Sequence, residues 1–345
     1  MPAIPLAIAL GLAAASPRTL VERRVASMGT SLDVAIVAPT RDAGLDASEI
    51  VVAEARRVED LLTTWRDSPL ARLNAAPPGV DVPVGQEIVH VLTEVFEWAR
   101  RTGRAFDPTV APLLRAWDLR GVGRIPAASE LIAAVAATGP EHFHISLKPG
   151  SVARLDPSAA IDEGAWGKGY ALDRAGQRLA AAGVADALID LGGQALALGR
   201  DASGDAWRIG VADPRDRERP VVLLSLTDVS SSTSANSERR RTVNGRRIGH
   251  ELDPRTGEPA PDFGSATVVA PSGLVADVLS TAFFVLGPVE GLALSGRLRA
   301  EGVPQEVLFL IERDGGLEAV ASPGFSRYVV SADPNLPGLP FPSTP

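Results

Sequence analysis

The sequence contains no cysteine in its 345 residues, and positive charge is in deficit, with a formal net charge of −8. The missing thiols exclude disulfides, thiolate metal sites and a lipidated N-terminal cysteine, although they name no compartment. No apolar run approaches the roughly 18 residues of a membrane span. The acidic balance argues against a nucleic-acid partner, because phosphate backbones are bound by clustered Lys and Arg. The one basic cluster, Arg239–Arg241 with Arg246 and Arg247, is short.

The two ends of the chain differ from the middle. Residues 1–17 include an apolar stretch that ends in small residues, as signal peptides do, but no Lys or Arg precedes Arg18. We therefore predict an exported, periplasmic protein with an atypical signal peptide. The alternative is a cytoplasmic protein whose N-terminus is disordered or packed. Residues 331–345 are proline-rich and predict an extended tail, which leaves 18–330 as the domain.

Helices and strands are expected to follow one another without the repeated βαβ units of a doubly wound sheet, which predicts an α+β fold. Apolar spacing predicts helices over 46–62, 88–99, 170–182 and 275–286. Asp46 and Glu49 resemble a capping box at the start of the first helix. Strands are expected over 31–39, 185–191, 207–211, 221–226 and 266–269, and the second of these runs into a Gly-Gly pair that suggests close approach to another group.

The segment Ile161–Asp173, with sequence IDEGAWGKGYALD, places glycines on both sides of Lys168 immediately before a helix. Such a turn can present backbone N–H groups and an ammonium to a phosphate. It is not a Walker A loop, because Gly169 rather than Ser or Thr follows the lysine. An ordinary glycine-rich turn with a solvated lysine is the alternative.

A second cluster, A-D-V-L-S-T, places Asp277 and Thr281 four residues apart, and therefore on one helical face. Carboxylate and hydroxyl oxygens are hard ligands that suit Mg²⁺. The alternative is helix capping by Asp277 and Ser280.

His250 is one of four histidines and lies three residues before an Asp253-Pro254 turn signal. It could act as an acid or base or orient a phosphate, although lone histidines are more often structural. The hydroxyl-rich run Ser230–Ser234 lacks a G-x-S-x-G elbow, so we propose no serine hydrolase.

Taken together and in order, these segments resemble the ApbE family, the FAD:protein FMN transferases. The resemblance runs from Met28 to about Gly287. Its most specific parts are 162–173, which is similar to D-x-x-x-x-x-K-G-Y-x-x-D, then D-L-G-G at 190–193, H-x-x-D-P-x-T-G at 250–257 and A-D-x-x-S-T at 276–281. The resemblance implies an ApbE-like, T-fold-like arrangement of mixed sheets flanked by helices, with an FAD site in a cleft between the two halves.

The resemblance also implies an activity: Mg²⁺-dependent transfer of FMN from FAD to a threonine of a partner flavoprotein, with release of AMP. The alternatives are a non-catalytic FAD-binding protein and an FAD pyrophosphatase that yields FMN and AMP. Peripheral association with a membrane redox complex is a further expectation.

Site residues are carried over by position. His250 and Asp277 would be catalytic. Metal ligation would fall on the Ala165 carbonyl, the Asp277 carboxylate and the Thr281 hydroxyl, with Ser280 as a further candidate. The flavin nucleotide would contact Met28, Trp65, Ala105, Phe106, Asp107, Asp162, Lys168 and Leu252.

The chain departs from the family pattern at several positions. Trp65 stands where tyrosine is usual, Glu163 where an apolar residue is common, and Ala235 where glycine is usual. Trp166 is bulkier than is frequent. Trp65, Phe106 and Trp166 are the candidates for stacking against a flavin or adenine ring.

Overall fold

The computed structural model describes residues 18–236, 241–243 and 245–339. The predicted signal peptide over 1–17, Arg239 and Arg240 of the basic cluster, and the last six residues of the predicted tail lie outside these ranges.

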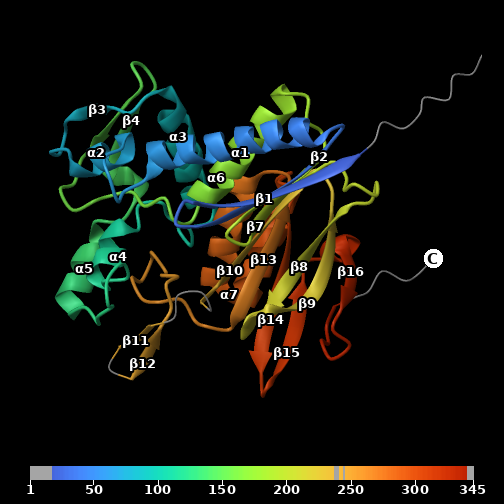
Figure 1. Cartoon of the computed structure of the whole chain (residues 1–345). Helices are drawn as coiled ribbons and strands as arrows, with labels where there is room; N and C mark the ends of the chain where they lie inside the picture. Colours follow the sequence, from blue (N-terminus) through green and yellow to red (C-terminus); the bar gives the residue numbers. More distant parts are fainter. Residues whose placement is uncertain (1–17, 237–240, 244, 340–345) are drawn as a thin grey trace, which may run out of the picture.

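An eight-stranded sheet, antiparallel throughout, forms the centre of the fold (Figure 1). In spatial order its strands are β1 (Thr19–Ser27), β2 (Thr30–Ala38), β6 (Ala187–Leu191), β7 (Gln194–Leu198), β10 (Val229–Ala235), β13 (Gly264–Ala270), β14 (Glu306–Arg313) and β15 (Gly316–Ala321). Strand β13 is buried along its whole length, so both faces of the sheet must be covered.

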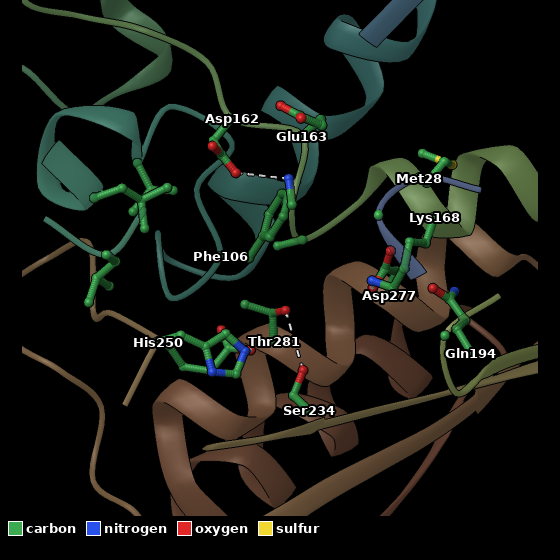
Figure 2. Close-up of a pocket in the computed structure, with 18 of the residues that line it drawn as sticks. Met28, Phe106, Asp162, Glu163, Lys168, Gln194, Ser234, His250, Asp277 and Thr281 are labelled. Carbon is green, nitrogen blue, oxygen red and sulfur yellow. Dashed lines mark hydrogen bonds and ion pairs between the residues drawn. The ribbon is translucent and has the colours of Figure 1, made fainter. Parts of the chain in front are cut away.

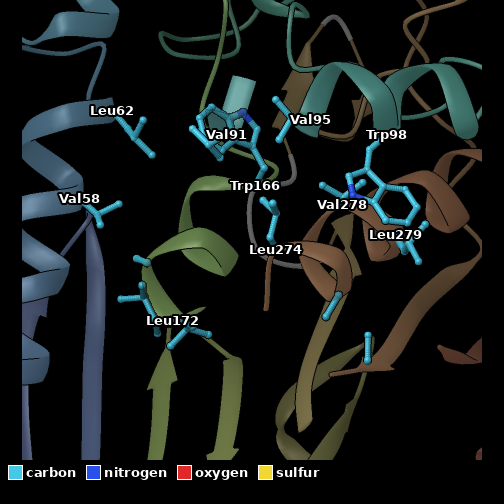
Figure 3. Packing of buried hydrophobic residues seen from close by; sticks show 14 of the residues in the cluster. Val58, Leu62, Val91, Val95, Trp98, Trp166, Leu172, Leu274, Val278 and Leu279 are labelled. Carbon is cyan, nitrogen blue, oxygen red and sulfur yellow. The ribbon is translucent and has the colours of Figure 1, made fainter. Parts of the chain in front are cut away.

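Three helices cover one face of this sheet: α1 (Arg41–Leu62), α6 (Gly167–Ala181) and α7 (Gly273–Ala300). Their apolar stripes meet in the main core, where Val58, Leu172 and Val278 are fully buried (Figure 3). Helix α3 (Gln86–Arg101) contributes to the same core through Leu92 and Val95. The packing of α6 against α7 sets the position of the two segments that carry the predicted chemistry.

A smaller sheet covers the opposite face. It contains β16 (Val329–Ala332), β9 (Asp216–Leu226) and β8 (Trp207–Asp213), in that order. Because successive strand residues point to opposite faces, Val268 packs in the helix-side core and Val269 in the core shared with the smaller sheet. The mixed helices and sheets confirm the predicted α+β class.

Apart from η3 (Phe325–Tyr328), which packs with the smaller sheet, the remaining elements form a lobe beside the main sheet (Figure 1). They are α2 (Pro69–Ala75), β3 (Asp81–Pro83), α4 (Ala111–Ala116), α5 (Ala128–Ala136), η1 (Pro140–His142), β4 (Phe143–Ser146), β5 (Ser151–Arg154) and the hairpin of β11 (Arg241–Val243) and β12 (Arg246–Ile248). Helices α4 and α5 share a separate small core with Ile248 and Leu252, so the hairpin is packed against the lobe.

Several boundaries differ from the sequence prediction. Helix α1 begins at Arg41, where the Thr40 hydroxyl accepts a hydrogen bond from Ala43 N at 3.2 Å, so Asp46 lies inside the helix and caps nothing. The chain also stays packed beyond Val330. Strand β16 runs to Ala332 and both Leu336 and Leu339 are buried, so the first part of the predicted tail belongs to the domain.

Helix α7 is long and apolar enough, by length and composition, to be compared with a membrane span, and it is the one such helix in the described part of the chain. Its backbone is interrupted at Gly287 (φ 73°), which precedes Pro288. Most of its apolar window is buried against the sheet and α6, so the helix is explained as the central helix of the core.

Candidate active site

A cleft of about 770 Å³ lies between the lobe and the edge of the helix-covered core. Figure 2 shows Asp162 and Glu163 on one side of this cleft and His250, Thr281 and Ser234 on the other. All the predicted site residues except Ser280 line it: Met28, Trp65, Ala105, Phe106, Asp107, Asp162, Ala165, Lys168, His250, Leu252, Asp277 and Thr281. The structure thus brings together residues that are far apart in the sequence.

Helices α6 and α7 cap each other at the bottom of the cleft. Asp173 of α6 accepts hydrogen bonds at the start of α7 from Gly273 N (2.6 Å) and Leu274 N (2.9 Å). In return, Asp277 of α7 accepts one from Gly169 N of α6 (3.0 Å). Each carboxylate thereby satisfies N–H groups that a helix start leaves without partners. The predicted alternative, that Asp277 caps its own helix, is wrong, because α7 begins at Gly273 with Ser272 as its cap.

Close approach of the two helices depends on glycine. A Cβ at Gly169 would lie 2.2 Å from the Gly273 carbonyl oxygen and 2.8 Å from the Asp277 Cβ. No side chain fits that space. Helix packing therefore requires the second glycine of the G-K-G sequence. The ammonium of Lys168 lies next to this contact, 3.4 Å from Asp277 Oδ1.

Three kinds of oxygen donor line the cleft around this point: the Asp277 carboxylate, the Thr281 hydroxyl and the Ala165 backbone. In a regular helix the N–H of Gly169 would donate to the carbonyl of Ala165, four residues earlier. Here it donates to Asp277 instead, and no hydrogen bond to the Ala165 carbonyl oxygen is present among the described residues. Those residues also contain no group of three or more His, Cys, Asp or Glu side chains placed to hold a metal ion. One carboxylate with neutral oxygens is nevertheless a donor set that suits Mg²⁺, which keeps water and phosphate ligands as well.

Ser280 does not line the cleft. Its hydroxyl is fully buried and interacts with Ser232 Oγ and Ser234 Oγ, each at 3.1 Å, while it donates to the Asp277 carbonyl. The structure therefore corrects the suggestion that Ser280 is a metal ligand. The hydroxyl-rich strand β10 holds the second turn of α7 in place, and Ser234 also lies 3.4 Å from the Thr281 hydroxyl.

Arg120, which the sequence did not reveal, organises the opposite side of the cleft. Its guanidinium pairs with Asp162, donates to Thr64 Oγ1 at 2.8 Å and stacks 4.5 Å from the centre of the Trp65 ring. Trp65 is 70% exposed at the mouth of the cleft. Only the tertiary fold brings the loop after α4 to this place, so no local pattern could have identified Arg120.

Glu163 lies beside this pair and accepts a hydrogen bond from Thr64 Oγ1 at 3.0 Å. Burial and then the negative charge of Asp162 raise the pKa of Glu163 to about 7. A carboxyl with that pKa is partly neutral at physiological pH. Glu163, which stands where the family commonly has an apolar residue, therefore adds less than a full negative charge to the cleft.

The Gly103–Val110 loop supplies Ala105, Phe106 and Asp107. Asp107 is buried, and its Oδ1 accepts hydrogen bonds from both the backbone N (2.9 Å) and the hydroxyl of Thr109. Burial raises its pKa. Asp107 therefore shapes the loop that presents Phe106 to the cleft.

Met28 enters from the two-residue turn between β1 and β2. Met28 (φ 49°) and Gly29 (φ 72°) both have the left-handed backbone that a tight hairpin turn requires. Glu59 accepts a hydrogen bond from Met28 N at 3.0 Å and holds this uncommon conformation in place.

His250 is half-buried, with Nε2 3.4 Å from Glu251 Oε1. His250 and Thr281 both line the cleft, and Figure 2 shows them on the same side of it. The expected turn follows, since Gly257 N donates to the Asp253 carbonyl at 2.8 Å and Gly257 has φ +77°. Leu252 comes from the same segment and packs in the small core of the lobe.

Two departures from the family pattern are accommodated. Ala235 lies in extended β10, paired with Ser265, where glycine is not needed. Trp166 is 0% exposed, and its indole N–H donates to the Asp162 carbonyl at 2.8 Å (Figure 3). Trp166 therefore supports the Asp162 segment from the core, and its prediction as a stacking wall is wrong.

The fold and the cleft define an α+β protein in which an ammonium and hard oxygen donors line a cleft suited to a phosphate-bearing ligand. The chain belongs to the ApbE family, whose model matches residues 28–303.

The relatives agree with this membership. A FAD:protein FMN transferase of Klebsiella pneumoniae is 30% identical over 88% of this chain and 88% of its own. The crystal structure of the ApbE protein of Thermotoga maritima has a TM-score of 0.80 at 29% identity, with 90% of this chain and 99% of that chain covered. The apo form of the Pseudomonas stutzeri flavinyl transferase ApbE has a TM-score of 0.78 at 29% identity, covering 91% and 98%. The family and fold predicted from the sequence are confirmed.

Proposed function

We propose that this chain transfers FMN from FAD to a threonine hydroxyl of a partner flavoprotein and releases AMP, with Mg²⁺ in the cleft. The enzyme class is that of its curated relatives, which are FAD:protein FMN transferases. The observation that carries the proposal is the convergence of Lys168, Asp277, Thr281 and Ala165 in one cleft of about 770 Å³. This volume suits a ligand of nucleotide size.

The residues around the two helix starts suit Mg²⁺, with Ala165, Asp277 and Thr281 as the groups that would hold it. A bound Mg²⁺ ion supplies positive charge that stabilises a pyrophosphate and its leaving oxygen. Lys168 and the N-terminus of α6 add to that charge and fix the position of the phosphates. Phosphoryl transfer depends mainly on such positioning and neutralisation.

The ring systems of FAD need an apolar, partly aromatic wall. Trp65 offers an exposed indole stacked on Arg120, and Phe106 contributes from the loop after α3. The pairing of Asp162 with Arg120 removes a free negative charge from the cleft, which favours an anionic ligand.

The proposed reaction is a direct displacement. The threonine Oγ forms a bond to the phosphorus of the FMN half, and the bond from this phosphorus to the bridging oxygen breaks. AMP leaves with that oxygen. The hydroxyl proton passes to His250, which lines the same cleft.

A labelling experiment tests the proposal. Purified protein is incubated with FAD, Mg²⁺ and a threonine-bearing acceptor fragment, and a matched fragment with valine in place of threonine is the control. We expect the threonine fragment alone to gain the mass of FMN while AMP appears. AMP release without a labelled acceptor would identify a pyrophosphatase, and FAD binding without either product would identify a binding protein.

Replacement of His250 separates chemistry from binding. His250→Ala is expected to slow transfer about 100-fold, because the proton acceptor is lost, while the affinity for FAD changes little. Transfer rates at saturating FAD and a separate FAD titration measure the two effects. His90→Ala, on the exposed side of α3, is the control. A loss confined to FAD affinity would make His250 a binding residue.

The place of action is also part of the proposal. The apolar start of the sequence supports export to the periplasm, where an acceptor flavoprotein associated with a membrane redox complex would meet the cleft.

A further inference from the structure

A second, open cavity of about 490 Å³ lies at the surface between α4, α5 and the loop that follows β5. Helix α4 separates the two spaces. Leu114 lines the cleft, whereas Pro112, Arg115 and Ala116 line the second cavity. Residues 114 and 116 are about 200° apart around a helix of 3.6 residues per turn, so the two cavities use opposite faces of α4.

Two arginines, Arg115 and Arg154, converge on the loop at the back of this cavity. Arg154 Nη1 donates to the carbonyls of Pro157 (2.8 Å) and Ala159 (3.2 Å). Arg115 Nη2 donates to the carbonyl between them, that of Ser158, at 2.6 Å. The two guanidinium groups therefore donate hydrogen bonds to the carbonyl groups of consecutive residues in one loop.

Neither arginine has a carboxylate partner among the described residues. The acid that lines the cavity, Glu130, is paired with Arg124 at its rim. Partial burial, and then the positive charges of Arg154 and Arg120, lower the pKa of Arg115. Arg154 is buried and Arg115 is exposed to solvent, so this cavity carries positive charge that no described carboxylate neutralises.

Donor capacity also remains. A guanidinium has five N–H groups. Arg115 uses one of them in the hydrogen bonds of the described structure, and Arg154 uses three, the third to the Ala76 carbonyl. The Nε of Arg154 is buried without an acceptor in the described part of the chain. Arg154 has a structural role in holding the loop, whereas Arg115 is exposed and its remaining donors are open to a ligand.

We propose that this cavity is a second anion site, in which Arg115 and Arg154 bind a phosphate group, either free phosphate or a phosphate monoester. Arginine pairs suit phosphate because their planar N–H groups match its oxygens. The other walls are the small apolar side chains of Ala116, Ala133, Ala134, Ala137, Pro112 and Pro157. They leave room for a compact apolar body next to the phosphate.

The site is coupled by the chain to the active-site segment. The loop 157–160 continues into Ile161, whose backbone N and O are both hydrogen-bonded to Asn74, at 2.9 and 2.8 Å. Asp162 follows directly and faces the cleft. The anion therefore binds next to the start of the segment that carries Asp162 and Ala165. Its binding does not depend on flavin transfer.

Calorimetric titration with inorganic phosphate tests the site in the full-length protein. Lys168→Met removes the ammonium of the cleft and is expected to keep the phosphate binding that depends on Arg115, because Lys168 lies in the other cavity. Arg115→Gln is expected to weaken binding at least about tenfold, as the loss of a charge-assisted hydrogen bond predicts. Arg124→Gln, which alters the paired rim arginine, is the matched control and should change the affinity little.

Phenyl phosphate distinguishes the two sources of the anion. If phenyl phosphate binds more tightly than inorganic phosphate, the alanine and proline side chains contact the organic group of a phosphate monoester. If the two bind equally, the site is one for free phosphate. The proposal is overturned if wild type shows no saturable binding, if Arg115→Gln binds as wild type does, or if Lys168→Met abolishes the binding. Arg115 is chosen for the test because Arg154 also holds the loop, so its loss could disturb folding.

Discussion

Asp277→Asn is expected to fold and to lose FMN transfer by about 10³-fold, because an amide oxygen supplies no negative charge for a metal ion in the cleft. The amide oxygen can still accept the hydrogen bond from Gly169 N, so the contact between α6 and α7 should persist. Transfer rates over a range of Mg²⁺ concentrations, with thermal unfolding as a check on the fold, measure the effect.

Asp213→Asn provides the control for Asp277→Asn. Asp213 is equally buried, but it lies in β8 of the smaller sheet and pairs with Arg215. This variant should lose stability without a specific loss of transfer. If Asp277→Asn kept wild-type turnover and Mg²⁺ dependence, the metal assignment would be wrong.

Gly169→Ala is expected to reduce the free energy of unfolding by about 3 kcal/mol and to abolish transfer. The new methyl group would lie 2.2 Å from the Gly273 carbonyl oxygen, so α6 and α7 must move apart. That movement breaks the Gly169–Asp277 hydrogen bond and displaces Lys168. Urea denaturation and the transfer assay measure the two losses.

Gly296→Ala is the matched change for Gly169→Ala. Gly296 lies in α7, and a Cβ there would meet no atom within 4 Å. Alanine favours helix over glycine by about 1 kcal/mol, so this variant should be as stable as wild type or more stable. A Gly169→Ala protein with wild-type stability and activity would show that the two helices do not need this close approach.

Much of the fold could be predicted from local patterns. Apolar spacing located the helices around Val58, Leu92 and Val278, because one buried stripe defines each of them. Helix starts were less predictable. Asp46 and Asp277 both resemble caps in sequence, but Thr40 and Ser272 begin the helices, since preceding residues also adopted helical backbone.

The candidate site was predictable where it consists of ordered motifs. The segments at Asp162, His250 and Asp277 keep the spacing of a known family, so their meeting in one cleft could be expected. Arg120 and the buried state of Trp166 could not, because both depend on contacts between segments distant in sequence. Ser280 shows the reverse error. It belongs to a matching motif, yet its position on the helix turns it toward β10.

The exchange of caps between Asp173 and Asp277 has a consequence for assembly. Neither helix start is complete until the other helix is in place, so α6 and α7 should order in a single step. The same step brings Asp277 beside Lys168. A nascent or partly unfolded chain therefore lacks the pair of Lys168 and Asp277 at the bottom of the cleft, which forms only when both helices have packed.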